Sequence, residues 1–263
     1  MIYILILIFF GFGIIAGSFL NVVISRFNTT KTLGGRSACM SCRSKLSWYE
    51  LVPILSFLFL RGRCRSCQTR ISRMYPAVEF TTGIVFAFLF LKFQGLFLVN
   101  ILDFLVTFAF YAFTFSTLIV IAFYDFKHQI IPDKLAIILA VSSFVGLFLF
   151  NQNGLDIHMP SLMDMASGFI IALPFLLLFI VSQGAWMGLG DAKLAVSLGW
   201  LLGLSRAISG VFLAFCVGAF ISVFLVILSR KYNMKSEIPF APFLVFGAIL
   251  AFIFNLIVFS GFQ

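Results

Sequence analysis

The chain has 263 residues, of which 62% are hydrophobic, only 10% are charged and 37 are phenylalanine. A soluble domain carries about 25% charged residues because its surface faces water, so this composition excludes an ordinary water-soluble fold. The net charge of +9 does not indicate a nucleic-acid partner, because 10 of the 18 Lys and Arg residues lie in residues 26–73, between two apolar segments. A nucleic-acid-binding protein would carry them on one face of a soluble fold.

Eight apolar segments are candidates for membrane-spanning helices, each of which needs about 20 mainly apolar residues. In chain order they are residues 2–24, 75–93, 97–123, 135–151, 162–182, 192–204, 207–229 and 238–260. The segment 192–204 is short, and its alternative is a half-helix or re-entrant piece enclosed by the other helices. We therefore expect an all-α membrane protein, a polytopic bundle of about eight transmembrane helices that forms a single membrane domain (1–263) in the lipid bilayer.

The distribution of basic residues predicts the orientation of the chain in the membrane. With the N-terminus outside, the inside loops are residues 25–74, 124–134, 183–193 and 230–237, and they hold 16 of the 18 Lys and Arg residues. Only Lys92 and Arg206 fall elsewhere. Because cytoplasmic loops are enriched in Lys and Arg, this count predicts a multi-pass protein with its N-terminus outside.

One sizeable polar insertion, residues 25–74, carries two CxxC pairs formed by Cys39, Cys42, Cys64 and Cys67. The pairs are separated by 21 residues, just above the spacing of about 15–20 that is usual in zinc ribbons. Four thiolates complete the tetrahedral coordination of zinc, so such a site would be structural. Two disulfides are the alternative, which the reducing cytoplasm disfavours. We expect a cytoplasmic cysteine-rich zinc-binding insertion.

Two of the nine acidic residues indicate chemistry. Asp125 ends an apolar helix and Asp191 closes the sequence GLGD at 188–191, so both are predicted at the same cytoplasmic depth. Two neighbouring carboxyls share a proton, so that one acts as a base on water while the other polarises a scissile carbonyl. We expect the glycines to hold unusual dihedrals and to let an extended peptide approach. Each aspartate alone could also be a helix cap, and Asp133, after Pro132, is the alternative for the first position.

Other residues carry plainer expectations. Glu50 and Glu79 lie in and just after the insertion, where we expect them to pair with nearby arginines. Asp164 stands at a helix end and is expected to be solvated. Cys216, in an apolar helix, is expected to be a small core residue.

Five ordered motifs together resemble the bacterial type IV prepilin peptidases, which are membrane aspartyl proteases of the GxGD type. The motifs are residues 17–26 (GSFLNVVISR), the double CxxC insertion with 60–65 (LRGRCR), residues 73–79 (RMYPAVE), Tyr124–Asp125 with 131–133 (IPD), and residues 188–193 (GLGDAK). The resemblance implies that Asp125 and Asp191 are the catalytic pair, within a catalytic helix bundle of residues 75–263. It also implies the substrate: the leader of a prepilin or pseudopilin, cut after a Gly at the cytoplasmic face of the bacterial inner membrane.

The resemblance implies a second activity for many family members, the methylation of the new N-terminal residue by S-adenosylmethionine. This activity is associated with the part of the family that carries the cysteines, although residues 25–74 contain no nucleotide-binding fingerprint. Residues 28–33 also lack the Pro that the family usually has there. Two other classes stay open: an ion-coupled transporter, which would place acids at mid-membrane, and a non-catalytic pilus or secretion assembly subunit, which would tolerate loss of either aspartate.

Overall fold

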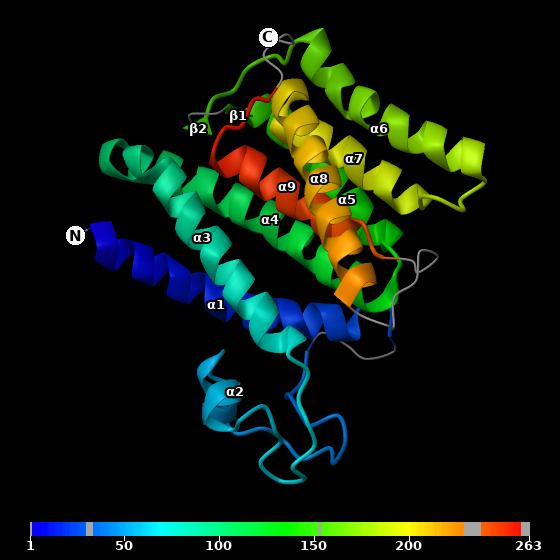
Figure 1. The fold of residues 1–263 in the computed structure, drawn as a ribbon. Helices are drawn as coiled ribbons and strands as arrows, with labels where there is room; N and C mark the ends of the chain where they lie inside the picture. The colour runs from blue at the N-terminus through cyan, green and yellow to red at the C-terminus, as the bar shows by residue number, and fades with distance from the viewer. Residues whose placement is uncertain (1, 30–33, 152–153, 229–237, 259–263) are drawn as a thin grey trace. The chain divides into compact units, whose positions relative to one another are not determined.

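The computed structural model describes residues 2–29, 34–151, 154–228 and 238–258, and nearly all of the regular structure in them is helical (Figure 1). The helices are α1 (Ile2–Arg26), η1 (Trp48–Leu51), α2 (Leu55–Phe59), α3 (Met74–Val99), α4 (Ile101–His128), α5 (Asp133–Leu149), α6 (Leu162–Ser182), α7 (Leu189–Leu202), α8 (Leu204–Leu228) and α9 (Ala241–Ile253). A small antiparallel hairpin of β1 (Phe150–Asn151) and β2 (Gly154–Leu155) follows α5. The expected all-α class is confirmed.

Each of the eight predicted membrane segments corresponds to one helix, namely α1 and α3 to α9. Five of these, α1, α3, α4, α6 and α8, are long and apolar enough to cross a membrane. The 14 residues of α7 extend for about 21 Å, which is less than the hydrocarbon thickness of about 30 Å. Eight is therefore an approximate count of spans. The basic loop 230–237 and the end of the last predicted segment lie outside the described residues.

The chain divides into two compact units, residues 1–91 and 92–263, and α3 contributes to both. In the first unit α1 packs along α3 through small residues, since a Cβ added to Gly13 would lie only 2.7 Å from the Cα of Gly83. One turn further along α1, a Cβ added to Gly17 would lie 2.7 Å from the Cα of Glu79. Such close backbone contact is typical of helix pairs in membranes. The single-domain description, with residues 75–263 as a catalytic bundle, stays a prediction.

Glu79 and Glu50 do not pair with arginines, so this expectation was wrong. Glu79 is only 7% exposed; it accepts hydrogen bonds from the Ile54 backbone N–H at 2.7 Å and the Asn21 side chain at 3.4 Å. Glu50 accepts from the Ser47 N–H at 2.7 Å in a capping box. Both carboxylates accept hydrogen bonds from backbone N–H groups that have no partner in a helix or strand. Such donors cannot be recognised in the sequence, whereas the charge of an arginine can.

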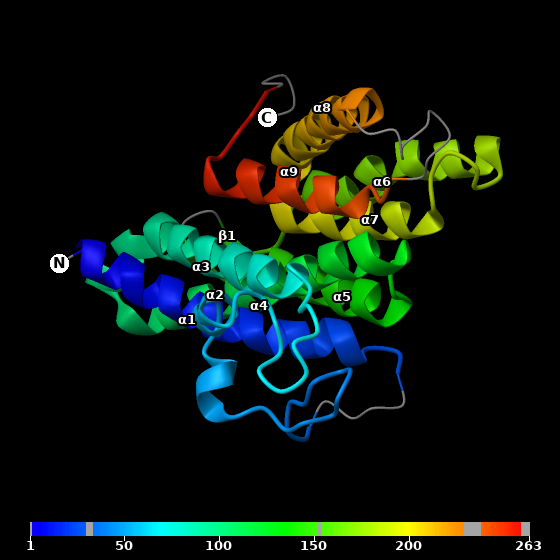
Figure 2. The same ribbon diagram turned by 60° about the horizontal axis from the view of Figure 1, so that its bottom comes forward.

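In the second unit α7 packs against both α5 and α6, and α8 packs along α9, as Figure 2 shows. The closest approach is again through glycines, because a Cβ on Gly199 of α7 would lie 2.5 Å from the Cα of Gly168 in α6. The outer face of α8 exposes Phe220 and Phe224, as expected for a helix that faces lipid. Cys216 is exposed on α8 rather than buried in a core, because an apolar solvent accepts small apolar residues on either face.

Candidate active site and metal centre

Asp125 lies in the last turn of α4, and only 6% of its surface is exposed. The helix ends at Gln129, which adopts the left-handed conformation and donates its N–H to the Asp125 backbone carbonyl at 2.7 Å. The Asp125 carboxylate accepts a hydrogen bond from the backbone N–H of Ala241, the first residue of α9. The positive end of the α9 dipole therefore faces this carboxylate and favours a negative charge on it.

Asp191 is the third residue of α7, whose N-cap is Gly188, and it is 9% exposed. Its carboxylate accepts the backbone N–H of Gly188, which is the reciprocal half of a capping box. The GLGD sequence thus forms a helix start that fixes its own acidic side chain. Gly188 has an ordinary φ of −77°, and Gly190 is not among the glycines with positive φ, so the expectation of unusual dihedrals was wrong.

Close packing explains the second glycine of the motif. A Cβ added to Gly190 would lie 2.9 Å from the Cβ of Ile131. Ile131 stands in the short connection between α4 and α5. Glycine at position 190 therefore lets the start of α7 lie directly against the segment that follows Asp125.

This packing brings the two predicted aspartates together from separate helices. Asp125 on α4 is close enough to Asp191 on α7 for its charge to act on the Asp191 carboxyl. Both side chains are buried, and two neighbouring carboxyls with little access to water do not ionise together readily. Two carboxyls that share one proton contain an acid and a base at the same time.

Asp133, the alternative for the first aspartate, occupies a different position. It is the first residue of α5, directly after the N-cap Pro132, as the sequence indicated. Its side chain is 70% exposed and forms a 2.5 Å ion pair with Lys193. The geometry therefore favours Asp125 for the buried pair. Lys193 belongs to the GLGDAK motif at 188–193, but no role was predicted for it from the sequence, and its ion pair with Asp133 is a finding of the structure.

The four predicted metal ligands also come together. The sulfur atoms of Cys39, Cys42, Cys64 and Cys67 all lie within 4.8 Å of one another, and none is in a disulfide. The Cys39 and Cys67 sulfurs are 3.8 Å apart. In a tetrahedral zinc site, Zn–S bonds of about 2.3 Å place neighbouring sulfurs about 3.8 Å apart. The cluster therefore has the geometry of a four-thiolate metal site.

The two CxxC turns have the same backbone conformation. In the first, the Cys39 N–H donates to the Ser44 carbonyl and the Arg43 N–H returns to the Cys39 carbonyl. In the second, Cys64 bonds to Thr69 and Gln68 bonds back to Cys64 in the same way. Arg43 and Gln68 both have positive φ, 57° and 58°. Each turn is thus a preformed knuckle that directs two sulfurs to one point.

Hydroxyl groups beside the knuckles favour the thiolate form of the exposed cysteines. Hydrogen bonds with the Thr69 hydroxyl and backbone lower the pKa of Cys67 to about 6. Hydrogen bonds with the Ser44 hydroxyl and backbone likewise lower the pKa of Cys42. Because the thiolate is the form that binds metal, these contacts prepare both knuckles for a cation.

Two family models match the chain. Residues 12–93, which include the four cysteines, match the Bacterial Peptidase A24 N-terminal domain. Residues 112–223, which include Asp125 and Asp191, match the Type IV leader peptidase family. The prepilin leader peptidase/N-methyltransferase of Bacillus subtilis (strain 168) is 32% identical over 254 residues, which cover 94% of each chain. This chain belongs to the type IV leader peptidase family.

Other curated relatives carry the same name. The prepilin leader peptidase/N-methyltransferase of Vibrio cholerae serotype O1 is 30% identical over 95% of this chain and 97% of its own length. That of Myxococcus xanthus is 33% identical over 87% of this chain and 65% of its own length. No solved structure matches significantly. Membership of the leader peptidase family, together with five helices that could cross a bilayer, makes this chain an integral inner-membrane protein.

Proposed function

We propose that this chain is a membrane aspartic endopeptidase that removes the leader of prepilins or pseudopilins, cutting after a Gly at the cytoplasmic membrane face. The observation that carries the proposal is the buried, interacting carboxyl pair formed by Asp125 and Asp191. The name shared by the relatives, prepilin leader peptidase/N-methyltransferase, supports the substrate. A non-catalytic assembly subunit would have no need for two buried carboxyls close enough to interact, since each is costly in an apolar environment.

The carboxyl pair supplies the chemistry of peptide hydrolysis. The ionised member takes a proton from a water molecule while the water oxygen attacks the scissile carbonyl carbon, and the protonated member donates to the carbonyl oxygen. The tetrahedral intermediate, which now has two hydroxyl groups, then breaks its C–N bond. The proton taken from water passes to the leaving amine, and one hydroxyl returns its proton to the second aspartate, which restores the pair. Backbone N–H groups of Ala241 and Gly188 hold the two carboxylates in place during these steps.

We also propose that the N-terminus lies outside, which places both aspartates at the cytoplasmic face. The two basic residues that depart from this topology are used inside the protein rather than in a loop. Lys92 donates to the Phe252 carbonyl at 2.7 Å and to the Asn255 side chain at 2.8 Å, at the C-terminus of α9. A cation at that end of a helix is favourable. Arg206 lines a cavity, so neither residue weakens the positive-inside count.

The cysteine cluster is proposed to hold one structural zinc ion. Zinc would bind Cys39, Cys42, Cys64 and Cys67 and would stabilise an insertion too small to have a large apolar core of its own. A closed four-thiolate site leaves no position for a substrate, so the ion would act on folding only. N-methylation with S-adenosylmethionine is supported by the names of the relatives, and we assign no residues to that cofactor.

One experiment tests the activity directly. The purified protein is incubated in detergent with a prepilin, with and without S-adenosylmethionine, and the product mass is measured. We expect loss of the leader in both reactions and a further gain of one methyl group where the cofactor is present. An intact prepilin in both reactions, from protein that is folded and monodisperse, would favour the assembly-subunit alternative. A product that is cut but not methylated would support the peptidase activity and contradict the methyltransferase activity.

A further inference from the structure

The second unit contains a cavity that the proposed peptidase chemistry does not use. It has a volume of about 210 Å³ and lies between α4, α5, α7, α8 and the β1 region. Tyr111 of α4 lines it and stands 14 residues before Asp125 on the same helix, which corresponds to about 21 Å along the axis. The cavity is therefore separate from the aspartate pair and lies toward the opposite end of α4.

Two buried polar atoms without partners belong to residues that line this cavity. One Nη atom of Arg206 and the Ser143 hydroxyl are buried and have no hydrogen-bond partner among the described residues. Buried polar atoms in native proteins are nearly always satisfied, and an exception calls for a bound group or water. Two exceptions from different helices that line one cavity indicate a shared occupant with acceptor atoms, since the guanidinium donates only.

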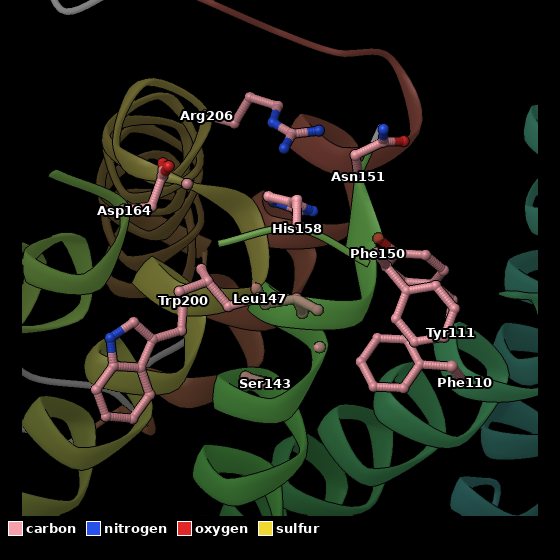
Figure 3. A pocket seen from close by; sticks show the side chains of 13 residues that line it. Phe110, Tyr111, Ser143, Leu147, Phe150, Asn151, His158, Asp164, Trp200 and Arg206 are labelled. Carbon is pink, nitrogen blue, oxygen red and sulfur yellow. The ribbon is translucent and has the colours of Figure 1, made fainter. Parts of the chain in front are cut away.

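Two other polar side chains of the cavity wall, those of Trp200 and Asp164, have partners. Trp200 donates its ring N–H to the Met165 carbonyl at 2.9 Å. The Asp164 carboxylate accepts from the backbone N–H and hydroxyl of Ser161 at 3.2 and 2.7 Å. In Figure 3 the side chain of Arg206 stands beside that of His158, with Trp200 on one side and aromatic rings on the other. Among the described residues that line the cavity, Arg206 and Ser143 are therefore the ones with a buried polar atom that has no partner.

Charged residues of both signs lie near the cavity: Asp164 and Arg206 line it, and Asp156 accepts a hydrogen bond from Asn151 of its wall. Arg206 and Lys92 are near enough for their charges to interact, and Asp164 is the acidic residue that acts on Arg206. Asp164 is also engaged in the capping box at the start of α6, and one Nη atom of Arg206 keeps no partner among the described residues. An anionic occupant would compensate the charge of that guanidinium in an apolar environment.

We propose that this cavity binds a phosphate group, either from a phospholipid headgroup or as free phosphate, with Arg206 as the principal ligand and Ser143 as a second donor. A guanidinium matches phosphate oxygens with two parallel N–H bonds. Tyr111 and Trp200 supply the aromatic surface that is enriched at the level of lipid headgroups. The occupant would join α5 to α8 at the end of the bundle remote from the aspartates.

The test compares ligands on the full-length, delipidated protein in an uncharged detergent. Thermal unfolding is measured with phosphatidylglycerol, with diacylglycerol, which lacks a phosphate, and with inorganic phosphate. At about 100 times Kd we expect a phosphate-bearing ligand to raise the midpoint by about 5–10 °C, and diacylglycerol to leave it unchanged. Stabilisation by inorganic phosphate alone would identify free phosphate as the source, and stabilisation by phosphatidylglycerol alone would identify the headgroup.

Variants assign any shift to the cavity. Arg206→Gln should abolish the stabilisation, Arg206→Lys should retain part of it, and Ser143→Ala should weaken it severalfold. Lys134→Gln, an exposed charge removed from the same unit, is the matched control and should respond as the unmodified protein does. If Arg206→Gln does not fold, two other measurements test the proposal. These are the stabilisation of the milder variant Ser143→Ala and the amount of phospholipid that native mass spectra show bound to the unmodified protein. Water alone in the cavity, shown by no shift with any ligand and no retained lipid, overturns the proposal, and so does an equal shift in Arg206→Gln.

Discussion

Gly190 at the start of α7 lies against Ile131 in the connection after α4, so closely that a Cβ on the glycine would stand 2.9 Å from the Ile131 Cβ. The two residues belong to separate sequence motifs, each of which contains one aspartate of the buried pair. Their contact therefore helps to hold Asp191 near Asp125. The distance between the two carboxyls depends on Gly190 having no side chain.

The first prediction concerns the two glycines of this motif. Gly190→Ala should push α7 away from Ile131 and reduce cleavage by about 10²-fold, the typical effect of a displacement of about 1 Å in a catalytic group. Gly188→Ala is the matched comparison, because its Cβ would meet nothing nearer than 3.8 Å and its φ is −77°. It should retain most activity. Equal loss in both variants would show that the glycines serve the approach of the substrate instead of helix packing.

The second prediction concerns the aspartates. Asp125→Asn and Asp191→Asn should each lower kcat by about 10³-fold or more, and the double variant should be little worse than either, because the residues act as a unit. Asp133→Asn removes only the exposed ion pair with Lys193, worth about 0–1 kcal/mol, and should keep most activity. Cleavage rates are compared at equal amounts of folded protein. An active Asp125→Asn beside an inactive Asp133→Asn would reverse the assignment.

The third prediction concerns the metal. Elemental analysis of the purified protein should find about one zinc per chain, and replacement of Cys64 and Cys67 by Ser should remove it. Loss of the ion should first expose residues of the insertion to proteolysis and only secondarily slow cleavage of the substrate, since the cluster is closed. A protein purified under reducing conditions that contains no metal, with both CxxC pairs oxidised, would contradict the zinc assignment. Cys216→Ser is the control and should leave the zinc content unchanged.

The fourth prediction concerns Glu79. Glu79→Ala would leave the Ile54 N–H without its acceptor, while Asn21 would keep only its hydrogen bond to the Tyr75 carbonyl. An unsatisfied buried group costs about 1–3 kcal/mol. We expect a lower thermal midpoint and faster proteolytic cutting near Ile54. Glu50→Ala loses only a capping interaction of about 1 kcal/mol and should change both measurements less. A Glu79→Ala protein with unaltered stability would show that the buried carboxylate does not hold the insertion to α3.

Local features of the sequence were sufficient to predict the helices and the cluster of four cysteines, and to name Asp125 and Asp191 as candidates. Apolar segments are predicted from composition alone because every spanning helix must satisfy its own backbone in lipid. The knuckles of Cys39 and Cys64 are equally local, since each forms its turn within a few residues.

Tertiary structure decided what depends on packing between distant segments. It favoured Asp125 over Asp133, because Asp125 is buried and accepts the Ala241 N–H. It placed Ile131 against Gly190 and the Ile54 N–H beside Glu79. It also brought Ser143 and Arg206 to one cavity, and it placed Cys216 on an exposed face. In a membrane protein the outside of a helix is as apolar as its inside, so hydropathy predicts where a helix runs but does not indicate which of its faces meets another helix.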